Sequence, residues 1–135
     1  ILYEPSFVQV LINETTVGLT EFFRNPPFWV FLKEEILPKL TDNPSLNIWH
    51  AGCSTGEEVY SMAILLLESD LGISTKLLAT DLNTHFIQVA QEAIYEEEVI
   101  QKGEFNYLKF ESFYRSIKNY FLLNNETFID FYKVL

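Results

Sequence analysis

Several residue types are scarce in this chain of 135 residues, and each shortage excludes a kind of site. A single cysteine, Cys53, excludes an internal disulfide and a zinc site built from several cysteines. The two histidines, His50 and His85, do not form a metal cluster by themselves. The longest uninterrupted apolar run, Met62 to Leu67, is far too short for a membrane span, and no signal-peptide pattern opens the chain. We therefore expect a cytoplasmic protein without direct membrane insertion.

Basic residues are also few. Nine Lys and Arg stand against 19 Asp and Glu, which gives a formal net charge of −10. Nucleic-acid binding depends on Lys and Arg that displace counterions from phosphates. The charge balance therefore argues against a DNA or RNA partner.

Apolar residues are abundant, at 48% of the chain, and they follow the periods of regular structure. A strand (46–51), a helix (57–71), a second strand (75–82) and a helix capped by Asn83 or Thr84 follow one another, which predicts part of a parallel α/β sheet. Before this unit we expect a helix or strand at 7–12 and a helical turn at 19–24 capped by Thr20. An amphipathic helix should then run from Pro27 to Leu40, with an apolar face formed by Phe28, Phe31, Leu32, Ile36 and Leu40. After the unit we expect an aromatic-rich helix at about 105–123 and a strand beginning within 127–135.

The segment between the first strand and the following helix carries the strongest functional signal. Gly52 and Gly56 lie on either side of a tight turn, where glycine permits positive φ and close approach of a ligand. Asp81 ends the next strand, 29 residues after Gly52, where an acid can accept hydrogen bonds from ribose hydroxyls. Glu57 and Glu58 at the helix start would repel a pyrophosphate but suit an ammonium or sulfonium group. The pattern therefore favours S-adenosylmethionine over NAD, although each feature alone also fits a simple turn or a capping acid.

The stretch Trp49-His50-Ala51-Gly52-Cys53-Ser54-Thr55-Gly56-Glu57-Glu58-Val59-Tyr60-Ser61 resembles the signature of the chemotaxis protein methyltransferase (CheR) family. Three more stretches agree in order and spacing: Leu19-Thr20-Glu21-Phe22-Phe23-Arg24, Ala79-Thr80-Asp81-Leu82-Asn83 and Ala93-Ile94-Tyr95. The resemblance covers about residues 15–135. It implies a Rossmann-like methyltransferase sheet with preceding helices, divided into a helical lead-in (1–45) and the first part of the S-adenosylmethionine-binding domain (46–135), truncated before the later strands.

The resemblance also implies roles for individual residues. Thr20 and Arg24 would lie near the methionine carboxylate and the transferred methyl, with Arg24 as the catalytic candidate. Glu58, with Glu57 beside it, would contact the cofactor's amino group. Asp81 would bind the ribose, and the backbone of Ala51 and Gly52 would pass close to the cofactor. The implied reaction methylates glutamate side chains of a methyl-accepting chemoreceptor or another signalling protein and leaves S-adenosylhomocysteine.

The chain departs from the family pattern at three positions, of which Gly18, together with the missing later strands, keeps a non-catalytic alternative open. Gly18 stands where the family often has Asn, His50 replaces the usual Ser, and Val59 replaces the usual Pro. A non-catalytic module that senses the cofactor or docks a partner is the main alternative, and a nucleotide-binding oxidoreductase is a weaker one. Two strands leave a sheet edge and apolar faces uncovered, so we also expect the chain to associate with a second copy or with a missing half.

Overall fold

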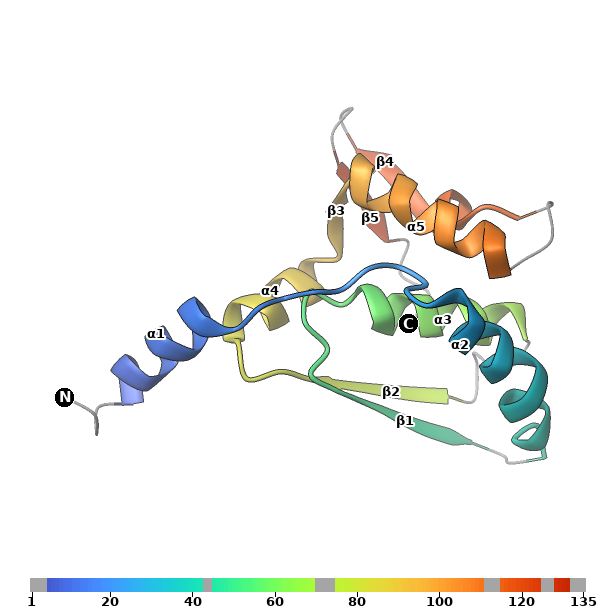
Figure 1. The fold of residues 1–135 in the computed structure, drawn as a ribbon, viewed down its shortest axis with the longest axis horizontal. Helices are drawn as coiled ribbons and strands as arrows, with labels where there is room; N and C mark the ends of the chain where they lie inside the picture. Colours follow the sequence, from blue (N-terminus) through green and yellow to red (C-terminus); the bar gives the residue numbers. More distant parts are fainter. Residues whose placement is uncertain (1–4, 43–44, 70–74, 111–114, 125–127, 132–135) are drawn as a thin grey trace.

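The structure is a computed structural model that describes residues 5–42, 45–69, 75–110, 115–124 and 128–131. Figure 1 shows two sheets, with α3 against the first and α5 against the second, and a long N-terminal segment running between these helices. The elements in chain order are α1 (Pro5–Thr15), α2 (Pro26–Phe31), a π-helical turn (Leu32–Ile36), a 3₁₀ turn (Leu37–Lys39), β1 (Leu46–Ala51), α3 (Glu57–Glu68), β2 (Thr75–Thr80), α4 (Thr84–Glu92), β3 (Ile94–Glu96), α5 (Glu97–Phe110), a second 3₁₀ turn (Ile117–Tyr120), β4 (Phe121–Asn124) and β5 (Phe128–Phe131).

The predicted strand–helix–strand–helix unit is confirmed. β1 and β2 pair in parallel, from Leu46 opposite Thr75 to Ala51 opposite Thr80. α3 covers the face that carries Ile48, His50 and Leu77, whereas Trp49 and Leu78 lie exposed on the other face. The predicted fold class, a partial Rossmann-like methyltransferase sheet, agrees with this arrangement because the turn after β1 and the end of β2 share one edge.

α4 begins as the sequence predicts. The side-chain oxygen of Asn83 accepts hydrogen bonds from the backbone N–H groups of His85 and Phe86, at 3.0 and 3.3 Å. Asn83 is therefore the N-cap, and Thr84 is the first helical residue. The Asn83 amide also donates to Thr16 Oγ1 (2.7 Å), which joins the segment after α1 to the start of α4.

The second sheet corrects the prediction of one long aromatic helix over 105–123. α5 begins earlier, at Glu97, and Phe121 starts β4. β5 pairs antiparallel with both β3 and β4, so the order in the sheet is β3-β5-β4. The strand expected within 127–135 is confirmed as β5, while 127 and 132–135 lie outside the described residues. β3 has only three residues and no alternation to read, so the pairing across the chain was not visible in the sequence.

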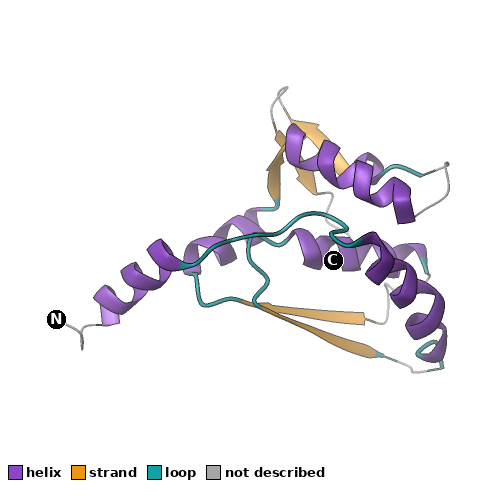
Figure 2. Cartoon of the chain, in the orientation of Figure 1, coloured by secondary structure: helices purple, strands orange, loops and turns teal. Residues whose placement is uncertain are grey.

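Two predictions for the N-terminal part need correction. Leu19–Arg24 is not a helical turn capped by Thr20, because only one turn bond is formed there, from Arg24 N to Glu21 O (3.4 Å). The helix from Pro26 buries Trp29 and Leu37, whereas Phe28 and Phe31 of the predicted apolar stripe are about half exposed. The other members of the predicted stripe, Leu32, Ile36 and Leu40, are half-buried, so the prediction is wrong for the first turns of this helix. Figure 2 shows helices joined by loops, and no strand, in the described residues before β1.

The core forms where the N-terminal segment, α3 and α5 meet. Phe22 is fully buried, and its ring contacts the edges of Tyr95 and Phe121, at centroid distances of 5.0 and 5.4 Å. Phe23 packs in the same manner on Trp29 and Tyr107, at 5.2 and 4.9 Å. Two consecutive aromatic residues therefore connect both halves of the molecule. Across the described ranges, no helix has the length and apolar character that a membrane crossing requires.

Candidate functional site

The turn between β1 and α3 uses its two glycines for different purposes. Gly52 has a φ of 79°, and a Cβ added there would meet no atom within 4 Å. Gly56 has a φ of 96°, but a Cβ there would lie 2.9 Å from the Ala90 Cβ and 3.0 Å from the Tyr95 hydroxyl. Gly56 is therefore required by packing as well as by backbone conformation. Gly52 leaves open space beside the backbone, as a closely approaching ligand needs.

The end of β2 holds this turn in place. The N–H groups of Gly52 and Cys53 both donate to the Thr80 carbonyl, at 2.8 and 2.9 Å. The Asp81 carboxylate then accepts from Ser54 N (2.8 Å) with one oxygen and from Asn83 N (2.9 Å) with the other. A carboxylate oxygen can accept two hydrogen bonds, so each Asp81 oxygen keeps capacity for a hydroxyl donor. Asp81 is a cap of the turn and is also available to a ligand.

The two glutamates at the start of α3 differ in environment. Glu57 is buried, and its carboxylate accepts a hydrogen bond from Thr55 Oγ1 (2.6 Å). The Glu58 side chain is 62% exposed, and its Oε1 lies 3.1 Å from Nδ1 of the buried His50. The hydrogen bond with His50 is the largest effect on the Glu58 pKa, and it holds that pKa below the usual value. Glu58 is therefore an accessible anion, whereas Glu57 belongs to the turn.

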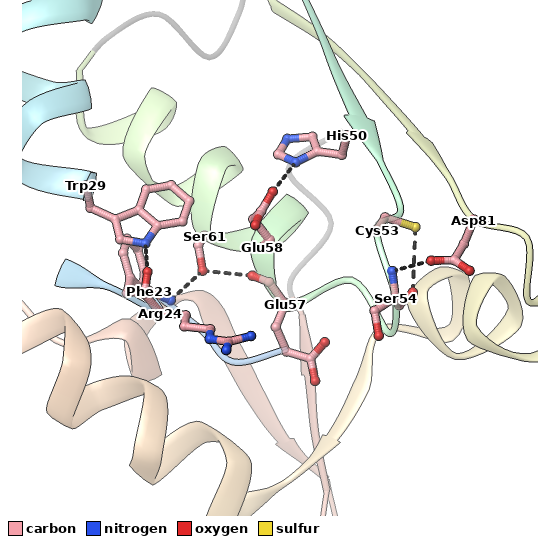
Figure 3. Close-up of polar contacts among 10 residues, drawn as sticks. All are labelled: Phe23, Arg24, Trp29, His50, Cys53, Ser54, Glu57, Glu58, Ser61 and Asp81. Carbon is pink, nitrogen blue, oxygen red and sulfur yellow. Dashed lines mark hydrogen bonds and ion pairs between the residues drawn. The ribbon is translucent and has the colours of Figure 1, made fainter. Parts of the chain in front are cut away.

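The segment 19–24 is positioned by hydrogen bonds from elements far apart in the sequence. Phe23 N donates to Ser61 Oγ (2.9 Å), and Ser61 Oγ donates in turn to the Glu57 carbonyl (2.7 Å), as Figure 3 shows. Trp29 Nε1 donates to the Arg24 carbonyl (2.9 Å). The left-handed backbone of Phe23 and Asn25 bends the chain on both sides of Arg24. Arg24 is thus presented beside α3 by a tightly held loop.

α5 holds the same segment from the other side. Lys102 Nζ lies 2.9 Å from Glu21 Oε1, and the Asn106 amide donates to Glu21 Oε2 (3.3 Å) and to the Phe22 carbonyl (3.1 Å). The hydrogen bond from Lys102 is the main reason that the Glu21 pKa lies below its usual value. Glu21 therefore has a structural partner on α5.

These elements enclose a cleft of about 280 Å³ next to the start of α3. Its walls combine one cation, Arg24, with an acid, Glu58, that has no Lys or Arg ion-pair partner among the described residues. The Arg24 guanidinium donates to the Leu19 carbonyl (2.8 Å) and is otherwise exposed to the cleft. The residues that line the cleft are Leu19, Thr20, Glu21, Arg24, Asn25, Phe28, Trp29 and Glu58.

The structure brings the predicted residues together in two groups. Thr20, Arg24 and Glu58 line the cleft. Ala51, Gly52 and Asp81 lie around the turn outside its lining, with Asp81 bound to Ser54 at the opposite side of the close-up (Figure 3). Glu57, the remaining predicted contact, is buried between the two groups in the described structure.

Two residues with clear positions in the site were not assigned roles from sequence. Ser61 is fully buried and connects the 19–24 segment to α3, and His50 contacts Glu58. Both occur in the Trp49–Ser61 stretch. A serine inside a helix and a histidine inside a strand form no sequence motif that predicts a hydrogen bond to a distant residue. Departure from the family pattern at His50 was the only signal.

Two other positions have packing explanations. A Cβ at Gly18 would lie 2.8 Å from the Phe86 ring and 2.9 Å from Ser54 Oγ, so the Asn that the family often has would not fit without rearrangement. Cys53 is buried, and burial is the main factor that raises the pKa of its thiol, with Asp81 adding to it. Cys53 is therefore a packed turn residue, as predicted, and a thiol with a raised pKa forms the nucleophilic thiolate less readily. No group of three metal-ligating side chains occurs in the part of the chain that the structure describes.

A glycine turn between a parallel strand and a helix, with an acid at the next strand end, is typical of α/β domains that bind nucleosides. The family model described as CheR methyltransferase, SAM binding domain matches residues 18–126. A Pseudomonas putida protein, provisionally named methyltransferase Cher3, is 41% identical over 79% of this chain and 39% of its own length. The Borreliella burgdorferi chemotaxis protein methyltransferase is 39% identical over 67% of this chain and 35% of its own length.

A third relative, chemotaxis protein methyltransferase 2 of Pseudomonas aeruginosa, is 34% identical over 73% of this chain and 36% of its own length. The chain belongs to the CheR methyltransferase family, and its residues 18–126 match the S-adenosylmethionine-binding domain of that family. It spans little more than a third of the length of these three relatives.

Proposed function

We propose that this chain carries one wall of the S-adenosylmethionine pocket of a protein-glutamate O-methyltransferase that acts on chemoreceptors. The observation that carries the proposal is the cleft in which Arg24 and Glu58 are both accessible. A free amino acid end carries a carboxylate and an ammonium group, and these two side chains have the matching charges. The names of the relatives, which are chemotaxis methyltransferases, support the substrate class.

The residues around the turn fit the rest of such a cofactor. The open space beside Gly52 admits a ligand against the backbone. Asp81 has acceptor capacity for ribose hydroxyls beyond its bonds to Ser54 and Asn83. Glu57 and Glu58 place negative charge at the N-terminus of α3, which disfavours a phosphate there and argues against NAD.

The reaction places modest demands on the protein's own groups. When bound, S-adenosylmethionine supplies a methyl group on a positively charged sulfur, and transfer to a glutamate carboxylate leaves a methyl ester and S-adenosylhomocysteine. A glutamate side chain with its usual pKa of about 4.3 is already ionised at neutral pH, so no strong general base is needed. The proposed work of Thr20, Arg24 and Glu58 is therefore positioning, with Arg24 binding a carboxylate through its two-pronged guanidinium.

The proposal is tested in the longest gene product that contains this chain. The two measurements are S-adenosylhomocysteine binding and transfer of labelled methyl groups to cytoplasmic fragments of receptors. We expect Arg24→Ala to reduce kcat/KM by about 10- to 100-fold, the loss of a charge-assisted hydrogen bond of about 1.5–3 kcal/mol. The melting temperature should change little, because the exposed Arg24 side chain makes one structural hydrogen bond, to Leu19.

Lys39→Ala is the matched control, because Lys39 is a 70% exposed cation whose ion pair with Glu35 should contribute little. Equal losses of activity and stability in Arg24→Ala would make Arg24 a structural residue. Cofactor binding without methyl transfer would favour a sensing or docking module. Tight NAD binding without S-adenosylhomocysteine binding would overturn the methyltransferase proposal.

A further inference from the structure

His50 lies near the end of β1 and contacts Glu58, the accessible acid of the cleft. Its side chain is 5% exposed, whereas the Glu58 side chain is 62% exposed. Nδ1 of His50 and Oε1 of Glu58 are 3.1 Å apart. Because an ionised carboxylate only accepts hydrogen bonds, the proton of this bond belongs to His50 Nδ1.

The other ring nitrogen of His50 has a different environment. Nε2 is buried and has no hydrogen-bond partner among the residues that the structure describes. Within the described residues, Nδ1 and its contact with Glu58 are therefore the hydrogen-bonding connection of the His50 ring.

We infer that His50 is a positioning residue that holds the Glu58 carboxylate in the orientation that receives the amino group of the cofactor. The inference rests on the proposed function, and it assigns to His50 a role that neither the family match nor the names of the relatives state. One Glu58 oxygen accepts from His50, so the other oxygen and the remaining lone pair of the first keep their acceptor capacity on a residue that lines the cleft. Without His50, the Glu58 side chain would lose conformational entropy when the ligand binds. Because the hydrogen bond to His50 already restricts the side chain in the ligand-free protein, the entropy cost of binding is smaller.

The arrangement predicts a selective effect on ligands. S-adenosylhomocysteine carries the amino acid end, whereas 5′-methylthioadenosine has the same nucleoside without it. His50→Ala should weaken binding of S-adenosylhomocysteine by about tenfold, which corresponds to one lost hydrogen bond of about 1.4 kcal/mol. Binding of 5′-methylthioadenosine should remain within about twofold, because Asp81 and the turn are unchanged.

Calorimetric titration of both ligands in the longest protein that carries these residues tests the inference. His50→Asn should restore S-adenosylhomocysteine affinity, because the Asn amide nitrogen can donate from near the position of Nδ1. In a Glu58→Gln background, His50→Ala should have little further effect on S-adenosylhomocysteine, because the two residues act as one unit. His85→Ala is the control, since His85 is exposed at the start of α4 and only its backbone N–H bonds to Asn83.

Distinct results would overturn the inference. Wild-type affinity for S-adenosylhomocysteine in His50→Ala would remove the role of His50 while leaving the proposed function intact. An equal loss of both ligands, with no recovery in His50→Asn, would make His50 a folding residue only. Failure of the unmodified protein to bind S-adenosylhomocysteine would instead reject the proposed function, and the role of His50 with it.

Discussion

At the scale of single residues, Asp81 has two roles that the sequence could not separate. The hydrogen bonds from Ser54 and Asn83 make it a structural cap of the turn, and its remaining lone pairs make it a candidate ribose ligand. From the sequence, a capping acid and a ribose ligand are alternative interpretations of Asp81, whereas the geometry allows both roles together. The stability of a protein substituted at Asp81 must therefore be measured beside its affinity, so that loss of the cap is separated from loss of the ligand contact.

Asp81→Asn removes the charge and keeps a single acceptor oxygen, so one of the two hydrogen bonds from Ser54 and Asn83 is lost, and we expect weaker binding of S-adenosylhomocysteine together with a measurable loss of stability. The loss of binding free energy should be about 1–3 kcal/mol, because ribose hydroxyls would lose a charged acceptor. Isothermal titration measures the affinity, and thermal unfolding of the ligand-free protein measures the structural part. Asp42→Ala, at an exposed position before β1, is the control. Unchanged affinity in Asp81→Asn would leave this residue a cap alone.

At the scale of elements, the 19–24 segment owes its position to partners on three helices. α3 contributes Ser61, α2 contributes Trp29, and α5 contributes Lys102 and Asn106. The segment forms no regular structure of its own, so its conformation depends on these partners. Arg24 would have no defined place in the cleft without them.

Ser61→Ala should destabilise the protein by about 1–3 kcal/mol, because the buried Phe23 N–H loses its Ser61 acceptor. We also expect weaker S-adenosylhomocysteine binding, since the loop that presents Arg24 becomes looser. Urea unfolding and ligand titration measure the two effects. Ser69→Ala removes a serine near the end of the same helix whose hydroxyl bonds only to the Leu65 carbonyl, and it should stay within about 0.5 kcal/mol of the unmodified protein. Equal effects of the two substitutions would contradict the proposed connection.

At the scale of the whole molecule, three tyrosine hydroxyls join the second sheet and α5 to the α3 layer. The Tyr95 hydroxyl donates to the Thr55 carbonyl (2.7 Å), which fastens β3 to the turn before α3. Tyr107 and Tyr120 both donate to the Glu68 carboxylate, so they fasten α5 and the second 3₁₀ turn to the end of α3. Burial is the first cause that raises the pKa of all three, with Glu68 adding to it for Tyr107 and Tyr120.

These shifts predict alkaline destabilisation. Tyr95 and Tyr107 have pKa values far above the usual one, and the Tyr120 pKa is raised to about 12. Above about pH 10 the unfolded chain loses these protons while the folded chain keeps them, so the free energy of unfolding falls as pH rises. Each such tyrosine adds a slope of about 1.4 kcal/mol per pH unit. Melting temperatures from pH 8 to pH 11.5 and tyrosine absorbance at high pH measure the effect. A constant melting temperature across this range would disagree with the prediction.

The face of the β1–β2 sheet that points away from α3 carries exposed apolar side chains. Trp49 and Leu78 lie opposite each other on the face away from α3, at 66% and 60% exposure. Such a face suits burial against another layer, as in doubly wound sheets. Association with a second copy or with further sequence remains a prediction from the sequence.

The local patterns of the sequence determined the parts of this protein that depend on neighbours along the chain. The bounds of β1, the start of α3, the Asn83 cap, the glycine turn and the acid after β2 could all be read from residues within one strand or helix turn. The same stretches carry the family resemblance. Short-range rules are sufficient there because backbone geometry, capping and side-chain alternation act over a few residues.

Only the tertiary structure decided the features that depend on residues far apart. β3 pairs with β5 across more than thirty intervening residues, and the 19–24 segment is shaped by Ser61 and Lys102. In the helix from Pro26, tertiary packing buries Trp29 and leaves Phe28 and Phe31 about half exposed. The contact between His50 and Glu58 likewise required β1 and α3 to meet around the turn, because side-chain partners are chosen by folding and not by spacing. The turn at Gly52 was thus determined locally, whereas the cleft beside it was created by the fold.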